Sequence, residues 1–237
     1  AMVANPEKAG EYRHILERDI EVSTTENDLI GYRFFNYSDY GLYRTGSWSP
    51  GLKMSSVRTV GAEIINYENL LGRFLCNGSL FLYREGSEYE DIFPVWDWTR
   101  VPGTTCILSD SLFPGVIMSQ YYTNKHDFVG GLSGDQAGVS AIIVNDAGLY
   151  AKKSYFFTKQ AVLCMGGDIR CERPFEITTS IEQKLQKGDI TVTRKAEGQV
   201  IYHDKTVYYI FDNPALKIQS GKVTGNWQRT AFINSPA

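Results

Sequence analysis

The sequence is poor in the residues that define disulfide-rich, metal-binding and nucleic-acid-binding proteins. Only four of its 237 residues are cysteine and three are histidine, and neither set has the spacing of a redox pair or a zinc site. A net charge of −3 excludes the broad positive field that nucleic-acid-binding proteins carry. No apolar run approaches the length of a membrane span. We therefore expect no nucleic-acid partner, no membrane partner and no metal site.

The short motifs of common enzyme classes are missing as well. The sequence contains no Gly-x-Ser-x-Gly elbow and no glycine-rich phosphate loop. The histidines are scattered, and His126 is either a catalytic base or a plain loop residue. Conventional hydrolase and nucleotide-binding mechanisms therefore find no support in the residues.

What the chain does contain is the pattern of a β-protein. Its 15 Tyr, 12 Phe and 4 Trp suit strands, and from residue 28 onward short apolar or alternating runs are separated by Gly, Pro, Asn and Asp. This pattern predicts one large antiparallel β-sandwich over residues 28–237. Residues 1–27 are expected to be a lead-in or linker, in which Pro6 and the residues up to Asp19 predict a short helix.

Three hairpin turns and one edge strand are predicted within the sandwich. Asn77-Gly78 has the signature of a two-residue hairpin loop, because both positions of such a turn need positive φ. Asp146-Ala147-Gly148 and His203-Asp204-Lys205 are predicted to form further hairpin turns. The basic pair Lys152-Lys153 suggests a solvated sheet edge, with one lysine on each face.

Two segments carry side chains of the types that bind sugars. Residues 63–69 hold two carboxylates and two amides, and residues 96–105 hold two Trp, one Arg and a Pro-Gly turn. Asparagine competes with regular backbone pairing, so a turn or capping network is one interpretation of the first segment and a binding site is the other. The second segment can equally be a set of rings packed into the sandwich edge.

In order along the chain, these segments resemble the conserved blocks of polysaccharide lyase family 8, which contains chondroitin AC, chondroitin ABC and hyaluronate lyases. Arg58 with Glu63, Asn66, Glu68 and Asn69 resembles the family's Ser-x-Arg…Glu-x-x-Asn-x-Glu-Asn block. The segment 96–105 resembles its Leu-Pro-Gly-Thr-Thr block, with Val in place of Leu, and two further blocks follow at residues 128–139 and 151–156. The resemblance covers roughly residues 30–185.

The resemblance implies a super-sandwich domain that follows a helical α/α toroid and precedes a smaller C-terminal β domain. The parent enzyme would cleave chondroitin sulfate, dermatan sulfate or hyaluronan by β-elimination at a uronic acid. In the family the catalytic Tyr, His and Arg lie on the toroid and have no counterpart in this chain, so the chain alone is expected to be inactive. No cofactor is implied, although a divalent cation could act in the parent enzyme. The substrate implies a secreted or periplasmic protein.

Site residues are carried over by position. Glu63 would orient the catalytic Tyr or Arg from across the domain interface, and Asn66 would contact the sugar. Asn69 and Arg58 are further candidates for contacts to the substrate on the same wall of the cleft. Trp98 and Arg100 are candidates for a substrate subsite, with packing as the other interpretation of both.

The residues are also compatible with two other functions. The chain could be a non-catalytic carbohydrate-binding sandwich with Trp96 and Trp98 as sugar platforms. It could also be a glycoside hydrolase with a carboxylate pair, for which Glu63 and Glu68 are the available residues.

Overall fold

The computed structural model describes residues 5–20, 30–113, 115, 117–212 and 214–232. The chain divides into two compact units, residues 1–30 and 31–237. The first unit contains a 3-10 turn, η1 (Pro6–Lys8), followed by the helix α1 (Ala9–Ile20), which confirms the predicted short helix. The expected boundary between residues 27 and 28 lies outside the described residues.

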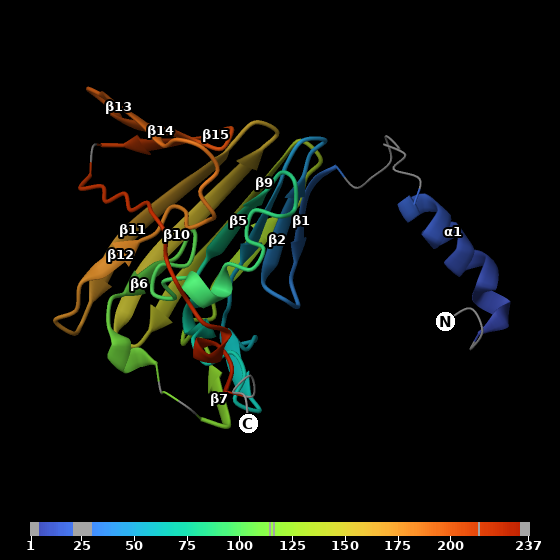
Figure 1. Cartoon of the computed structure of the whole chain (residues 1–237), viewed down its shortest axis with the longest axis horizontal. Coiled ribbons are helices and arrows are strands. Elements are labelled where there is room, and N and C mark those ends of the chain that lie inside the picture. The colour runs from blue at the N-terminus through green and yellow to red at the C-terminus, as the bar shows by residue number, and fades with distance from the viewer. Residues whose placement is uncertain (1–4, 21–29, 114, 116, 213, 233–237) are drawn as a thin grey trace. The chain divides into compact units, whose positions relative to one another are not determined.

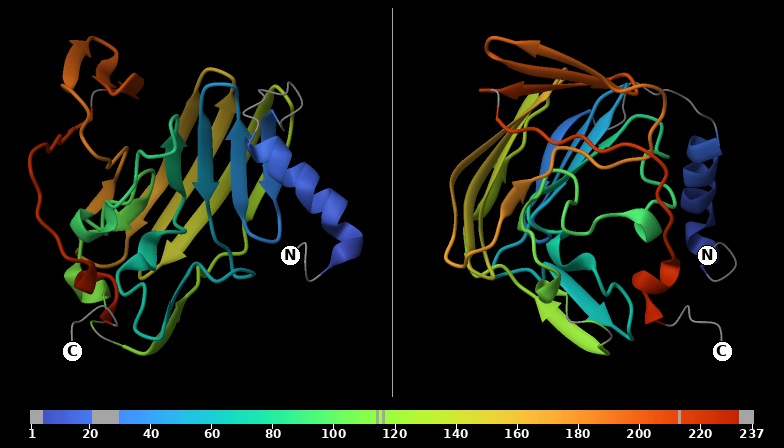
Figure 2. Two further views of the ribbon diagram at one scale, coloured as in Figure 1. Left: turned by 45° about the vertical axis from the view of Figure 1, so that its right-hand side comes forward. Right: turned by 60° about the vertical axis from the view of Figure 1, so that its left-hand side comes forward.

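The second unit is built on two four-stranded antiparallel sheets, which Figures 1 and 2 show facing each other as two layers. The first sheet has the strand order β1-β2-β3-β5, and the second has the order β11-β10-β9-β8. The strands of the first are β1 (Gly31–Phe35), β2 (Tyr40–Arg44), β3 (Ser49–Lys53) and β5 (Ser79–Tyr83), and those of the second are β8 (Val129–Leu132), β9 (Ala137–Asp146), β10 (Leu149–Thr158) and β11 (Val162–Cys171).

Three smaller antiparallel sheets and four 3-10 turns complete the unit. The small sheets pair β4 with β7, β6 with β12, and β14 with both β13 and β15. This architecture confirms the predicted all-β antiparallel sandwich. The strands are β4 (Ala62–Ile65), β6 (Thr105–Ile107), β7 (Ser119–Tyr122), β12 (Ile177–Thr179), β13 (Thr191–Lys195), β14 (Gly198–His203) and β15 (Thr206–Phe211), and the turns are η2 (Gly72–Phe74), η3 (Phe93–Val95), η4 (Asp110–Leu112) and η5 (Trp227–Arg229).

The main core lies between the two large sheets. Side chains alternate along β10, so that every second one points inward. Tyr155 and Phe157 of β10 are almost fully buried, and Phe157 stacks on Tyr32 of β1 with ring centroids 4.5 Å apart. Such aromatic contacts between layers supply much of the buried apolar area that holds the two sheets together.

Two of the predicted hairpins form and one does not. Ala147 and Gly148 connect β9 to β10 with positive φ, and Asp204 and Lys205 connect β14 to β15 in the same way. The prediction at Asn77-Gly78 was wrong, because the preceding residues form the turn η2 and β5 pairs with β3. The glycine is still required, because its φ is 79° and because another side chain lies close to it. A Cβ at this position would lie 2.2 Å from the hydroxyl oxygen of a core tyrosine.

The prediction of a solvated edge at Lys152-Lys153 was also wrong. Strand β10 is central, with β9 on one side and β11 on the other. Lys152 is exposed and pairs with Asp168 at 3.1 Å. Lys153 is buried, donates to the carbonyl oxygen of Gly103 and has its pKa lowered to about 8 by desolvation.

Candidate functional site

The segment 63–69 forms the end of strand β4 and a tight turn. Asn66 and Tyr67, the two central residues, have φ of 53° and 64°, and the backbone N–H of Glu68 donates to the carbonyl oxygen of Ile65 at 2.9 Å. A two-residue turn with both φ values positive favours asparagine and disfavours a bulky ring. The sequence signal at Asn66 is thus explained by turn geometry, and the strained Tyr67 marks a position where function is often found.

Asn69 closes this turn from inside. Its φ is 58°, and its side-chain amide donates to the carbonyl oxygen of Glu63 at 2.8 Å. Gly72 makes room for that side chain, since a Cβ there would lie 2.0 Å from the Asn69 amide oxygen. Asn69 therefore fixes the shape of the turn, and its side-chain amide is used in a hydrogen bond to the backbone.

Glu63 and Asn66 present their polar groups outward. Alternation along β4 buries Ala62 and Ile64 and exposes Glu63, and Asn66 is exposed at the start of the turn. Among the described residues, neither side chain has a hydrogen bond or an ion pair. One carboxylate acceptor and one amide, which both donates and accepts, are therefore free to bind a hydroxyl-rich ligand or a donor from elsewhere.

The structure places Arg58 in a different network. Its guanidinium pairs with the fully buried carboxylate of Asp39 at 3.3 Å and donates to the carbonyl oxygen of Asp127 at 2.6 Å. The same carboxylate accepts from Ser56 and Thr59 at 2.7 Å each. Arg58 compensates a buried charge and fixes the loop that leads to β4. It is not brought into the turn with Glu63.

The residues of the Trp-Arg segment are packed. Trp98 is 7 % exposed and donates to the carbonyl oxygen of Phe93 at 3.2 Å, and Trp96 is 1 % exposed. Arg100 forms an ion pair with Asp97 three residues earlier. This placement favours the packing interpretation for Trp98 and Arg100, and it leaves neither Trp ring open as a sugar platform.

A buried aromatic cluster fixes this loop. Trp96 stacks on Phe81 of β5 at a ring separation of 5.9 Å and meets Trp98 edge to face at 5.4 Å. The side chain of Gln183 accepts from the backbone N–H of Asp97 at 2.8 Å and donates to the carbonyl oxygens of Asp97 and Arg100. Nearly every polar group of the loop is therefore satisfied internally.

Sequence reasoning missed two features of this region. Tyr67, one residue beyond Asn66, is 37 % exposed, and its ring lies 6.0 Å from that of Phe232. The chain segment around Phe232 is hydrogen-bonded to the turn although it lies more than 150 residues later. No local pattern in the sequence announces such a pairing.

Metal and membrane features can be judged over the same part of the chain. Within the described residues no group of three or more His, Cys, Asp and Glu side chains could hold a metal ion. None of the helices described in the structure is long and apolar enough to cross a membrane.

Fold and site together define an antiparallel β-sandwich protein with an exposed carboxylate and amide at the end of the two-stranded sheet of β4 and β7. The sequence profile of the polysaccharide lyase family 8 super-sandwich domain matches residues 30–234. The chain belongs to this family, which confirms the resemblance seen in its sequence.

Characterised relatives carry the same region. The chain is 34 % identical over 211 residues to the chondroitinase-AC of Pedobacter heparinus, a match that covers 83 % of the chain and 29 % of that protein. It is 29 % identical over 163 residues to a hyaluronate lyase of Thermasporomyces composti, covering 65 % of the chain and 20 % of that protein. A chondroitin sulfate ABC exolyase of Bacteroides thetaiotaomicron is 27 % identical over 241 residues, with 86 % and 24 % covered. The matched region is thus less than a third of each relative.

Solved structures agree with the fold. A chondroitinase AC lyase, known from complexes with oligosaccharides, superposes with a TM-score of 0.76 at 27 % identity and covers 99 % of this chain and 37 % of that one. The chondroitin AC lyase of Streptomyces coelicolor in complex with chondroitin sulphate superposes with a TM-score of 0.73 over 88 % of this chain and 29 % of that one. At 24 % identity, the second likeness supports the fold alone.

Proposed function

We propose that this chain is the super-sandwich domain of a glycosaminoglycan lyase and forms one wall of its substrate cleft. The observation that carries the proposal is the turn at the end of β4. Its carboxylate and amide at Glu63 and Asn66 have no hydrogen bond or ion pair to the described residues, and it lies within the family match. A polar pair held rigidly but left unbonded is suited to a ligand or to another domain.

The proposed reaction is a β-elimination at a uronic acid. A base removes the proton from C5, the bond between C4 and the glycosidic oxygen breaks, and a C4–C5 double bond forms while the leaving oxygen takes up a proton. The C5 proton is weakly acidic, so the negative charge that develops on the carboxylate side must be stabilised by hydrogen-bond donors or by a cation. Positioning of the sugar is therefore as important as the base.

Within that scheme the two residues have distinct roles. Asn66 binds a sugar hydroxyl or the uronate with its side-chain amide. Glu63 accepts a hydrogen bond from a Tyr or Arg that a helical toroid domain supplies, and thereby orients it. Asn69 holds the turn in shape. The base itself is proposed to lie on the toroid, and a smaller C-terminal β domain is the other proposed partner.

The relatives support the substrate class. Their names assign them to chondroitin, chondroitin sulfate or hyaluronan, and each is several times longer than the matched region. Chondroitin sulfate, dermatan sulfate and hyaluronan are therefore the substrates that we propose. The alternative of a non-catalytic carbohydrate-binding module with Trp96 and Trp98 as sugar platforms is not supported, because both rings are buried.

The test is a lyase assay on the complete product of the gene that encodes this sequence. We expect ultraviolet absorbance from unsaturated uronate with at least one of the three polysaccharides. Asn66→Ala and Glu63→Gln should each lower kcat/KM by about 10²-fold or more. Glu172→Gln, on an exposed glutamate, and Asn36→Ala, on an exposed turn asparagine, are the matched controls and should leave turnover unchanged.

Two outcomes would overturn the proposal. One is cleavage that yields only saturated ends, which would indicate hydrolysis by paired carboxylates. The other is the absence of cleavage of all three polysaccharides.

The proposed substrate is extracellular, so we also propose a secreted or periplasmic location. Fractionation of the source cells with an antibody against this domain would test it, and a signal confined to the cytoplasmic fraction would contradict it.

A further inference from the structure

A distant segment of the chain returns to the candidate turn and extends it. The backbone N–H of Leu70 donates to the carbonyl oxygen of Thr230, and that of Phe232 donates to the carbonyl oxygen of Tyr67, both at 2.9 Å. Glu68 and Ala231 form an antiparallel bridge between these two bonds. Figure 1 shows the 3-10 turn η5, in red, at the same end of the unit as the cyan strand β4. Residues 226–232 are therefore part of the same surface as Asn66.

This segment is held on both sides by backbone contacts and by a helix cap. The side-chain oxygen of Asn226 accepts from the backbone N–H of Gln228 at 2.9 Å, which caps η5 at its start. The preceding Gly225 lies directly against η3, since a Cβ there would be 1.9 Å from the carbonyl oxygen of Pro94. The close approach ties the segment to the Trp-containing loop on one side, while the hydrogen bonds tie it to the turn on the other.

Trp227 offers an aromatic face on this surface. Its side chain is 44 % exposed, and it meets Phe93 edge to face with ring centroids 6.3 Å apart. Phe93 itself is 41 % exposed. The contrast with the two buried tryptophans of the neighbouring loop is sharp, because a large ring held at the surface by a capped turn retains a face for the C–H groups of a pyranose.

Arg229 adds a positive charge to this surface. Its guanidinium donates to the carbonyl oxygen of Pro94 at 3.3 Å, and in the described part of the chain no carboxylate pairs with it. It lines a cavity of about 290 Å³ together with Leu71, Trp98 and Asp97. The Asp97 carboxylate is already paired with Arg100, so the guanidinium is the uncompensated charge of this cavity.

We infer that Trp227 and Arg229 form an additional binding subsite for the polysaccharide, next to the turn of Asn66. Trp227 stacks on a sugar ring, and Arg229 binds an anionic oxygen group of the same chain, either a sulfate or a uronate carboxylate. This inference rests on the proposed function, because it takes its ligand from it. It adds a contact surface that is supplied by residues 226–232, which are distant from the turn in sequence but next to it in space.

Calorimetric titration of the 237-residue chain with two hexasaccharides of equal length, one from chondroitin sulfate and one from hyaluronan, tests the subsite. We expect Trp227→Ala and Arg229→Gln each to weaken binding about tenfold. Loss of binding to the sulfated ligand alone on Arg229→Gln would identify the sulfate as its partner, and equal losses for both ligands would identify the carboxylate.

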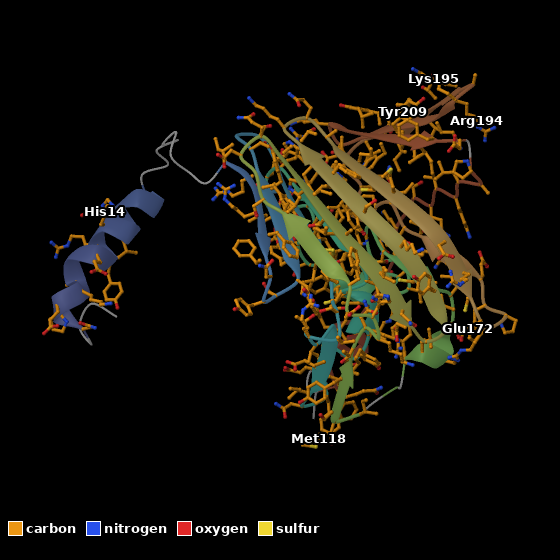
Figure 3. All side chains as sticks on the ribbon, turned by 180° about the vertical axis from the view of Figure 1, so that it is seen from behind. His14, Met118, Glu172, Arg194, Lys195 and Tyr209 are labelled. Atoms are coloured by element: carbon orange, nitrogen blue, oxygen red, sulfur yellow. The ribbon has the colours of Figure 1, made fainter. Side chains whose placement is uncertain are left out.

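Matched controls lie elsewhere on the surface. Tyr37, a fully exposed aromatic residue in the turn between β1 and β2, is removed in Tyr37→Ala. Arg194 is exposed on β13, and Figure 3 shows it at the opposite end of the unit from Met118, which adjoins β7. Tyr37→Ala and Arg194→Gln should leave the affinity unchanged. Thermal melting of every variant confirms that each chain is folded.

The inference is overturned if the unaltered chain binds neither ligand, or if its affinity survives both Trp227→Ala and Arg229→Gln. Either result leaves the proposed function to be judged by the lyase assay on Glu63→Gln and Asn66→Ala. Conversely, binding that depends on Trp227 in a chain whose complete gene product releases no unsaturated uronate would exclude the lyase and retain the subsite.

Discussion

The segment at residues 63–69, which includes the candidate turn, and the loop at residues 93–103 both hold side chains of types that bind sugars, yet the fold uses them in opposite ways. In the loop, the rings of Trp96 and Trp98 are buried, and the polar groups are bonded to Gln183, Lys153 and one another. In the segment 63–69, the side chains of Glu63 and Asn66 are exposed and make no hydrogen bond or ion pair to the described residues.

The difference shows that residue type alone does not identify a sugar site. A Trp or an Arg binds a ligand only when tertiary packing leaves part of its surface or charge unused. The tryptophan rings of the loop are packed in the aromatic cluster with Phe81, whereas Trp227 and Arg229 are exposed on the surface beside the turn. Stability and binding should therefore separate when the two regions are mutated.

The largest expected effect is on stability, at the centre of the loop cluster. Trp96→Ala removes a side chain that is 1 % exposed and should lower the free energy of unfolding by about 3–5 kcal/mol, as truncations of buried aromatics do. Urea denaturation followed by circular dichroism measures it. Trp227→Ala is the matched control and should cost less than about 1 kcal/mol, because its ring is largely outside the core. Equal losses for the two tryptophans would contradict the comparison.

The second expected effect concerns the buried lysine that supports the loop at Gly103. The pKa of Lys153 is lowered to about 8 by burial, whereas the pKa of a lysine in the unfolded chain is about 10.4. Between these values the unfolded state binds more protons, so the contribution of Lys153 to the free energy of unfolding rises with pH, by up to about 3 kcal/mol. At pH values below the pKa of Lys153 in the folded protein, this contribution does not change with pH.

The measurement is the free energy of unfolding between pH 7 and pH 10, compared with Lys153→Met. The thiol of the buried Cys106 and that of Cys164, whose pKa values are raised by desolvation, remain in both proteins and largely cancel in the difference. Lys152→Met, on the exposed face of the same strand, should show no such rise. A flat difference curve for Lys153→Met would mean that the ammonium group is solvated.

The contrast also explains how far the sequence could predict this protein. Period-two runs and turn residues predicted an antiparallel sandwich, and local signals sufficed at Ala147-Gly148, where both strands of the hairpin are adjacent in the chain. The same kind of signal failed at Asn77-Gly78, because the partner of β5 is β3, some thirty residues earlier. Local rules cannot choose between a neighbouring and a distant partner when core packing decides.

The candidate site was predictable to a similar extent. The block from Glu63 to Asn69 was found because its residue types stand close together in sequence and resemble a family pattern. Whether Trp98 is buried, whether Lys153 points inward and whether residues 226–232 return to the turn all depend on contacts between distant segments. Those contacts leave no periodic trace in the sequence.

A smaller effect is expected inside the turn. Asn69→Ala removes the hydrogen bond to the carbonyl oxygen of Glu63. It also places at φ 58° an alanine, which tolerates this left-handed conformation less well than asparagine does. Together these changes should lower the free energy of unfolding by about 1–3 kcal/mol. Asn69→Gly keeps the backbone conformation at little strain and should cost the hydrogen bond together with a smaller entropic loss from the more flexible unfolded chain. Thermal denaturation of the two variants separates these contributions. An alanine variant that melts no lower than the glycine variant would mean that the left-handed backbone strain is no larger than the entropic cost of glycine.

The smallest effect on stability should come from the residue with the largest proposed role in binding. Asn66 has φ 53° and no side-chain bond to the described residues, so Asn66→Gly should change the free energy of unfolding by less than about 0.5 kcal/mol. Asn66→Val is the strained counterpart and should cost about 1–2 kcal/mol, because a β-branched residue resists positive φ. Both variants lose the amide, so both should lose turnover in the complete gene product to the same degree. A glycine variant that keeps full turnover would show that Asn66 is present for the shape of the turn alone, and the wall of the cleft would then depend on Glu63.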